Sequence, residues 1–122
     1  VAEFHQIEPR FGFVAYVPPG SIAAGRKIAA QGMGTAAACE ACHGRGLLGA
    51  DMPGIGIAPP LAGRSPTYIV RELILFRLGG RANAQAALMR QETSDLTLQD
   101  MIAVAAYAAS LAPQVELTGR AP

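Results

Sequence analysis

Apolar residues recur at helical spacing in three stretches of the chain, so the pattern predicts a mainly helical protein. The first stretch, 22–31, follows Ser21, an N-cap candidate, and Gly32 ends it. Gly25 and Ile28 fall on nearby faces of this helix. No stretch shows the two-residue alternation of a half-buried strand, so no β-strand is predicted. The pattern therefore favours an all-α fold.

The other two predicted helices have stronger boundary signals. Helix 67–78 follows Ser65, a cap, and Pro66 at the first helical position, and two glycines end it. Thr97 can cap a helix over 98–111, which a proline ends two residues later. The residues that form the apolar stripes of these two helices are Ile69, Leu73 and Phe76 in the first and Met101, Val104, Ala105, Tyr107, Ala108 and Leu111 in the second.

The segments between the helices carry turn chemistry. Residues 1–20 mix aromatic, proline and charged residues without a helical period, so an extended lead-in or linker segment is expected there. Residues 44–63, which are rich in Gly, Pro and Ala, and residues 81–94, which are rich in Ala and include an Asn, are predicted to be loops. A chain of 122 residues builds one core. We therefore expect one domain over 21–113 and a C-terminal tail over 114–122.

Cys39, Cys42 and His43 form a C-x-x-C-H run that uses both cysteines and one of the two histidines of the chain. This is the attachment pattern of a c-type haem. Two thiols one helical turn apart add to the two vinyl groups of one haem, and the adjacent histidine supplies an axial nitrogen to the iron. The run predicts one covalent haem c per chain, with a chemical reason for each residue.

Three other interpretations compete with haem. A redox dithiol normally follows a buried strand, and residues 32–38 show no strand pattern. A structural zinc needs about four ligands, and beyond the run only His5 and scattered carboxylates remain. A chance match is rare, on the order of one chain in a thousand, because Cys and His are scarce residues. Haem is the best supported of the four.

The composition agrees with a small protein whose core includes a cofactor. The chain is 51% apolar, mostly through alanine, but only 6% aromatic, and it has no Trp. A flat cofactor would supply much of the missing apolar bulk, so folding and haem binding are expected to be coupled. No apolar run approaches the ~20 residues that span a bilayer. The chain begins at Val1 without a signal peptide, and thioether formation belongs to an exported compartment in bacteria, so we expect a processed periplasmic protein.

Charge is distributed unevenly. Residues 43–90 hold six arginines against two acidic residues, a balance of +4, whereas residues 91–122 come to −3. Compensation of two buried haem propionates on an ordinary surface would explain this, and so would a docking face for an acidic partner. A net charge of +1 and a single lysine argue against nucleic acid as a partner.

The sixth iron ligand decides the function, because a ligand on each side of the iron suits electron transfer and an open position admits small molecules. Met101 lies inside the last predicted helix, where a core side chain is expected. Met33 precedes Cys39 too closely to reach the opposite haem face, and Met52 lies in the loop on the histidine side. Met89 follows His43 by 46 residues in a predicted irregular stretch, long enough to cross to the distal face, so we predict Met89 as the ligand.

Taken together, these features resemble a class I c-type cytochrome, and more narrowly the haem domains of the bacterial tandem di-haem cytochromes c. The resemblance extends from Phe13 to Leu111, although only one C-x-x-C-H run is present. The segments that carry it are 13–21, the Gly25 helix, 39–44, 60–64, 68–77, 87–89 and 96–107. It implies a fold in which the N- and C-terminal helices cross and loops wrap one covalent haem.

The resemblance also implies roles for two small residues. The Pro60 carbonyl would face the ring nitrogen of His43, fixing the tautomer and strengthening the iron bond. Gly25 would let the first helix cross closely over the last, near Val104 and Tyr107. In the middle of a helix a glycine otherwise costs about 1 kcal/mol.

The predicted function is that of a periplasmic one-electron carrier, with a redox protein as donor and another as acceptor. Electrons would pass through the thioether edge near Cys42. Arg81 and Asn83 are candidates for holding a propionate. Candidates for surface contacts to a partner are Arg45, Arg64 and Arg90.

Two alternative functions stay open. Ile74, Leu75 and Leu78 occupy positions where the resembling domains are usually polar. A loop or the aromatic lead-in segment could cover this face, or it could be an oligomer or subunit interface of a larger dehydrogenase or oxidase complex. A haem enzyme or gas sensor with an open sixth site is the other alternative, for which the sequence offers no distal acid or base beyond His5.

Overall fold

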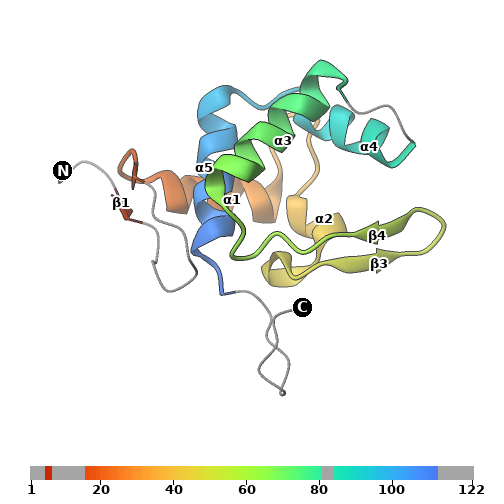
Figure 1. Cartoon of the computed structure of the whole chain (residues 1–122), viewed down its shortest axis with the longest axis horizontal. Helices are drawn as coiled ribbons and strands as arrows, with labels where there is room; N and C mark the ends of the chain where they lie inside the picture. The colour runs from red at the N-terminus through yellow and green to blue at the C-terminus, as the bar shows by residue number, and fades with distance from the viewer. Residues whose placement is uncertain (1–4, 7–15, 81–83, 113–122) are drawn as a thin grey trace.

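Two helices at opposite ends of the chain cross at the centre of the molecule. The computed structural model describes residues 5–6, 16–80 and 84–112, and in it α1 (Ser21–Gln31) packs across α5 (Leu98–Ser110) (Figure 1). At the crossing, a Cβ atom on Gly25 would lie 1.9 Å from the Ala103 carbonyl oxygen and 2.9 Å from the Tyr107 Cβ. Only glycine permits this approach. The predicted close crossing at Gly25 is confirmed.

A third long helix, α3 (Pro66–Leu78), packs against both α5 and α4 (Ala84–Thr93) (Figure 1). Together with α1 and α5 it encloses the main apolar core, and Cys39 and Met89 pack against the edge of that core. The buried members of this core are Ile28, Leu47, Ile69, Leu73, Leu96, Met101, Val104, Ala105 and Ala108. The described part of the chain contains no helix with the length and apolar character needed to cross a bilayer.

The helix boundaries follow the predicted signals closely. The Ser65 hydroxyl caps α3 by accepting from the Tyr68 N–H, and Gly79 ends that helix in the left-handed conformation at φ 73°. Thr97 caps α5 in a reciprocal pair with Asp100, with bonds of 3.0 and 2.9 Å. The predicted cap of the first helix is wrong by one residue, because Ser21 is already helical and makes no side-chain cap bond.

Two short strand pairs correct the prediction of a strand-free chain. Within the predicted loop 44–63, β3 (Ala50–Met52) pairs antiparallel with β4 (Gly56–Ala58). In the lead-in segment, β1 (His5–Gln6) pairs with β2 (Tyr16–Val17). Strands of two or three residues are too short to show a period in the sequence. The fold is nonetheless helical in class, as expected.

The predicted loop 81–94 also needs correction, since α4 occupies most of it. Ala84–Thr93 consists largely of Ala, Gln, Leu, Met, Arg and Glu, which are strong helix formers. Residues 81–94 contain neither Gly nor Pro, so the turn-favouring composition belongs to 44–63 alone. Met89 therefore lies on a helix rather than in an irregular segment.

Two acidic side chains from the α4–α5 region hold the segment that leads into the cysteine motif. Asp95 accepts from both the backbone N–H and the hydroxyl of Thr35, the former at 2.7 Å. Glu92 accepts from the Ala37 N–H. The chain just before Cys39 is thereby attached to the helix that carries Met89.

The Asp95 bond predicts a pH-dependent contribution to stability. The hydrogen bonds from Thr35 hold the pKa of Asp95 below its usual value of 3.8. A depressed carboxyl pKa gives stability that is present above about pH 4 and lost as the pH falls through the folded-state value. Asp95→Asn should lower the melting temperature modestly at pH 6 and progressively less below pH 4. Thermal melts across this range check it, with the exposed Asp51→Asn as a control, and a deficit that persists at low pH would contradict it.

Candidate haem site

The cysteine motif forms a short helix of its own, α2 (Cys39–His43). Residues three apart on a helix lie on the same face, so the two thiols are neighbours as attachment to one planar group requires. Cys39 is half-buried against the apolar core, and Cys42 is exposed. Both thiols are free rather than joined in a disulfide. The predicted spacing is therefore realised on a helical turn.

His43 is buried, with 8% of its surface exposed, and its ring orientation is fixed by one hydrogen bond. The Nδ1 atom lies 2.8 Å from the Pro59 carbonyl oxygen. A carbonyl can only accept, so Nδ1 must carry the proton. The lone pair of Nε2 is then available to a metal, which is the tautomer that an axial imidazole ligand needs.

The carbonyl that holds His43 belongs to Pro59, which corrects the expectation that Pro60 would do so. The Pro60 carbonyl instead accepts a 2.8 Å bond from the Arg64 Nε. The residue before a proline is held in an extended conformation, in which successive carbonyls point to different sides of the chain. Only one of two adjacent prolines can therefore face the imidazole.

A left-handed turn brings the Pro59 segment beside α2. Leu47, at the end of η2 (Arg45–Leu47), is fully buried and has a φ of 56°, which is unusual for a residue other than glycine. Its carbonyl accepts from the N–H groups of Leu61 and Ala62, at 2.8 and 3.1 Å. The Gly49 N–H donates to the His43 carbonyl at 2.7 Å. The Gly49 bond attaches the chain before the hairpin to His43, and the Leu47 bonds attach the chain after the hairpin to this turn.

The surroundings of the thiols argue against a redox dithiol and against a structural zinc site. Burial is the main cause that raises the pKa of the Cys39 thiol to about 11. A redox-active dithiol needs the opposite shift, because the thiolate is the reactive form. Among the described residues, no group of three or more Cys, His, Asp or Glu side chains is placed to hold a metal ion. A structural zinc site is thus unsupported there.

The four methionines differ clearly in their surroundings. Met101 is 1% exposed inside the core, as expected for a structural residue. Met33 is 38% exposed in the segment before α2, and Met52 lies half-buried in β3. Met89 is half-buried and packs against the same core as Cys39. In Figure 1, α2 and α4 lie on the same side of the α1–α5 crossing, and the Glu92 bond to Ala37 links α4 to the segment that leads into α2.

The other predicted site residues have mixed outcomes. Arg81 and Asn83 lie outside the described residues. Arg64 is engaged with the Pro60 carbonyl, and Arg90 packs its guanidinium against Gly79. Sequence reasoning missed the roles of Glu92 and Asp95, because a carboxylate that binds a distant backbone N–H leaves no local signal.

The residues present fit a covalently attached haem. Two unpaired thiols lie one turn apart, and the imidazole next to them has its metal-binding nitrogen free. A half-buried thioether is available from a second helix that borders the same core. Soft sulfur and imidazole donors suit iron in a porphyrin better than they suit a hard cation.

The similar proteins that comparison finds are cytochromes c. Cytochrome c-554(548) of Halomonas halodenitrificans is 36% identical over 83 residues, which cover 67% of this chain and 94% of that protein. Cytochrome c-552 of Acidithiobacillus ferridurans is 40% identical over 61% of this chain. Cytochrome c4 of Stutzerimonas stutzeri is 31% identical over 79% of this chain. No family model matches.

Comparison with solved structures also finds cytochromes c. Cytochrome c4 of Acidithiobacillus ferrooxidans superposes with a TM-score of 0.63 at 35% identity over 75% of this chain. The reduced recombinant cytochrome c4 of Pseudomonas stutzeri gives a TM-score of 0.68 at 28% identity over 77%. The chain spans half the length of each of these two solved chains. It spans 29% of the length of cytochrome c-552 and 46% of that of the Stutzerimonas stutzeri cytochrome c4. These cytochromes c are electron-transfer proteins with covalently bound haem c, not enzymes. The chain belongs to the c-type cytochromes, as a class I member related to the tandem di-haem cytochromes c.

Proposed function

We propose that this chain is a periplasmic one-electron carrier with one haem c, bound through Cys39 and Cys42 and ligated by His43 and Met89. The observation that carries the proposal is the 2.8 Å bond from the His43 Nδ1 to the Pro59 carbonyl. It prepares the imidazole as a fixed metal ligand directly beside two free thiols. The domain that performs this function would be residues 21–113, with 1–20 as a lead-in and 114–122 as a tail.

The haem, when bound, supplies a reversible ferric/ferrous couple. The chain contributes rigidity. His43 is held by Pro59 from one side, and its own carbonyl accepts from Gly49. Ligands whose positions do not change between redox states keep the reorganisation energy small. A protein that only moves electrons needs no group to donate or accept protons at a substrate.

Met89 would set the potential. A thioether ligand favours the ferrous state, and burial against the apolar core disfavours the additional positive charge of the ferric state. Both effects raise the reduction potential, so we expect a value that is high for a haem protein. The exposed Cys42 marks the edge through which electrons would reach a donor or an acceptor.

A second function is supported by the apolar surface of α3. Two of the predicted interface residues are exposed on this helix: 36% of the surface of Leu75 is exposed and 74% of that of Leu78. A carrier that diffuses freely gains nothing from such a surface, whereas a subunit that is held in a larger redox complex does. The alternative is therefore a haem-bearing subunit or domain of a dehydrogenase or oxidase complex.

The cofactor proposal has a direct chemical test. After co-expression with a haem-attachment system, the intact mass of the denatured wild type should exceed the chain mass by one haem. Cys39→Ser/Cys42→Ser should lose this covalent haem completely, and each single variant should retain one thioether bond. His43→Ala is the control, because it removes the ligand but neither thiol. A wild type without covalent haem would overturn the proposed function.

A further inference from the structure

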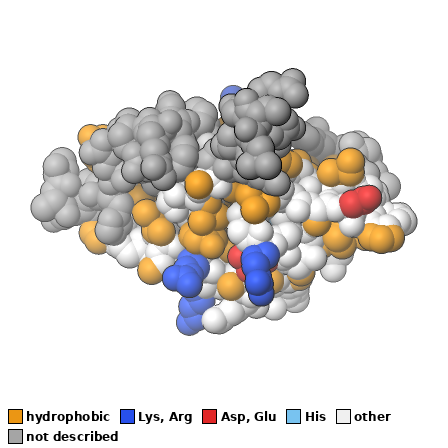
Figure 2. Space-filling model, turned by 90° about the horizontal axis from the view of Figure 1, so that it is seen from below, with side chains coloured by type: hydrophobic (Ala, Val, Ile, Leu, Met, Phe, Trp, Pro, Cys, Tyr) orange, Lys and Arg blue, Asp and Glu red, His pale blue; other side chains and the backbone are white. Residues whose placement is uncertain are grey.

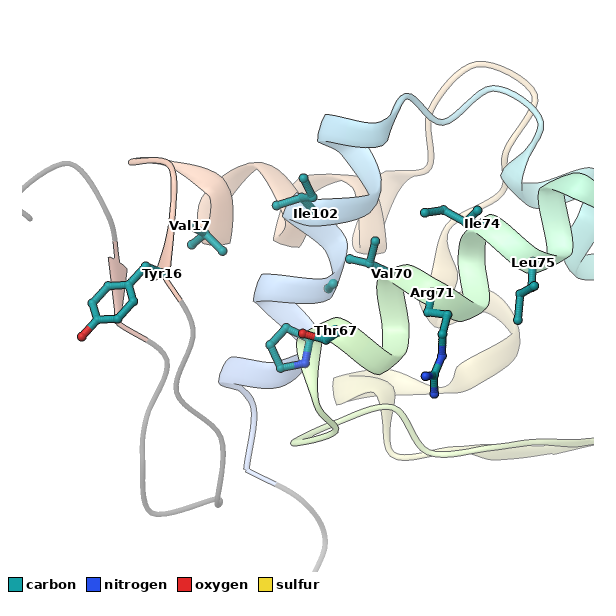
Figure 3. A pocket seen from close by; sticks show the side chains of 10 residues that line it. Tyr16, Val17, Thr67, Val70, Arg71, Ile74, Leu75 and Ile102 are labelled. Atoms are coloured by element: carbon teal, nitrogen blue, oxygen red, sulfur yellow. The ribbon is translucent and has the colours of Figure 1, made fainter.

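An apolar groove runs between β2, α3 and α5, apart from the haem site. Its volume is about 460 Å³. Figure 3 shows the Val70, Ile74 and Leu75 side chains on the α3 side, with Val17 and Ile102 on the opposite side. The lining residues are Tyr16, Val17, Pro66, Thr67, Val70, Arg71, Ile74, Leu75, Ile102 and Ala105.

The groove explains part of the unusual apolar surface of α3. Ile74 and Leu75, two of the three residues where the resembling domains are usually polar, line the groove. The third, Leu78, lies on the same helix but does not line it. The apolar character is therefore concentrated in a hollow that could receive side chains, rather than on a flat face.

The rim of this groove is cationic. Among the described residues that line it, Arg71 is the only charged one. The guanidinium carbons of Arg71 and Arg64 lie 5.8 and 5.9 Å from the centre of the Tyr68 ring, so this ring brings a second cation close to Arg71. Neither arginine has a carboxylate partner among the described residues. On the face seen from below, Figure 2 shows apolar side chains between basic ones, with an acidic side chain against one of the basic groups.

Charge also narrows the choice of occupant. In a symmetric dimer through this face, the cationic rim of one copy would meet the cationic rim of the other, and like charges oppose such contact. A membrane surface is matched by protruding apolar side chains rather than by a hollow. An amphipathic helix that presents apolar side chains to the groove and carboxylates to Arg71 and Arg64 satisfies both features.

We propose that this groove is the docking site for an acidic amphipathic helix of a partner subunit. The inference deepens the second function above, that of a haem-bearing subunit. No residue of α2 lines the groove, so a docked helix leaves the exposed Cys42 free. The chain could then remain attached to its complex while it exchanges electrons at the other site.

The test uses the ferrous holoprotein, labelled for NMR, and a synthetic helical peptide of about 15 residues with leucines on one face and glutamates beside them. Binding should shift the signals of Val70, Ile74 and Ile102 and leave those of α2 unchanged. A peptide with lysine in place of each glutamate should bind at least tenfold more weakly. Arg71→Gln should weaken binding of the acidic peptide about threefold to tenfold, with the exposed Arg26→Gln as its control.

Leu75→Ser and Leu78→Ser form a matched pair on one helix. Leu75→Ser should weaken binding about tenfold, whereas Leu78→Ser should change it less than twofold, because only Leu75 lines the groove. Equal binding of both peptides, shifts that centre elsewhere, a dimer that Leu75→Ser dissociates, or preferential binding to anionic lipid vesicles would each overturn the proposal. Reversible reduction of the same sample, measured in parallel, reports separately on the electron-carrier function.

Discussion

Met89→Ala is expected to abolish the weak long-wavelength absorption band of thioether-bound ferric haem while the covalent haem is retained. The side chain is half-buried at the edge of the core that Cys39 also borders, and no other methionine has comparable surroundings. Removal of the thioether also removes the ligand that favours the ferrous state. The midpoint potential should therefore fall well below that of the wild type, and the ferrous form should gain an open coordination position.

Met33→Ala and Met52→Ala are the matched controls for this experiment. Met33 is exposed, and Met52 lies in the β3 strand of the hairpin, so neither change should affect the band or the potential strongly. Optical spectra of the ferric forms and a redox titration provide the two readouts. Loss of the band in Met52→Ala but not in Met89→Ala would assign the ligand to the hairpin and contradict the proposal.

Gly25→Val is expected to destabilise the holoprotein by about 3 kcal/mol or more, because overpacking at this crossing cannot be relieved by a side chain. A Cβ atom would lie 1.9 Å from the Ala103 carbonyl oxygen, which belongs to the backbone of α5. The two helices would have to separate, and the core between them would open. The free energy of unfolding from guanidinium denaturation measures the effect.

Ala23→Val is the control for the Gly25 substitution. Ala23 is exposed on the same helix, so the variant reports only the helix-propensity cost of a β-branched residue, about 0.7 kcal/mol at most. If Gly25→Val were no less stable than this control, the close crossing of α1 and α5 would be wrong. The predicted fold would then lose its central contact.

The long helices were predictable because their signals are local. A proline at the first turn of α3 and the Thr97 cap of α5 act within one turn of the chain, where sequence and structure correspond directly. The cysteine motif is local in the same sense, since its three functional residues lie within five positions on one short helix. The resemblance to known haem domains added the Gly25 crossing, which no local pattern shows.

The features that sequence reasoning missed depend on contacts between distant segments. The choice of Pro59 over Pro60 is decided by how the left-handed Leu47 turn places the chain beside His43. The bond from Thr35 to Asp95 joins residues sixty positions apart. The helix that carries Met89 was missed for a different reason, because its run of strong helix formers was grouped with the glycine- and proline-rich loop 44–63.

The central claim is that the iron is ligated on both sides, and exposure of the ferrous wild-type holoprotein to carbon monoxide tests it most directly. Ligation by His43 and Met89 predicts a low-spin spectrum that carbon monoxide does not change on mixing, whereas ferrous Met89→Ala binds the gas readily. A wild type that is already high-spin and binds carbon monoxide at once would contradict the account. The sixth position would then be open, as in a haem enzyme or gas sensor.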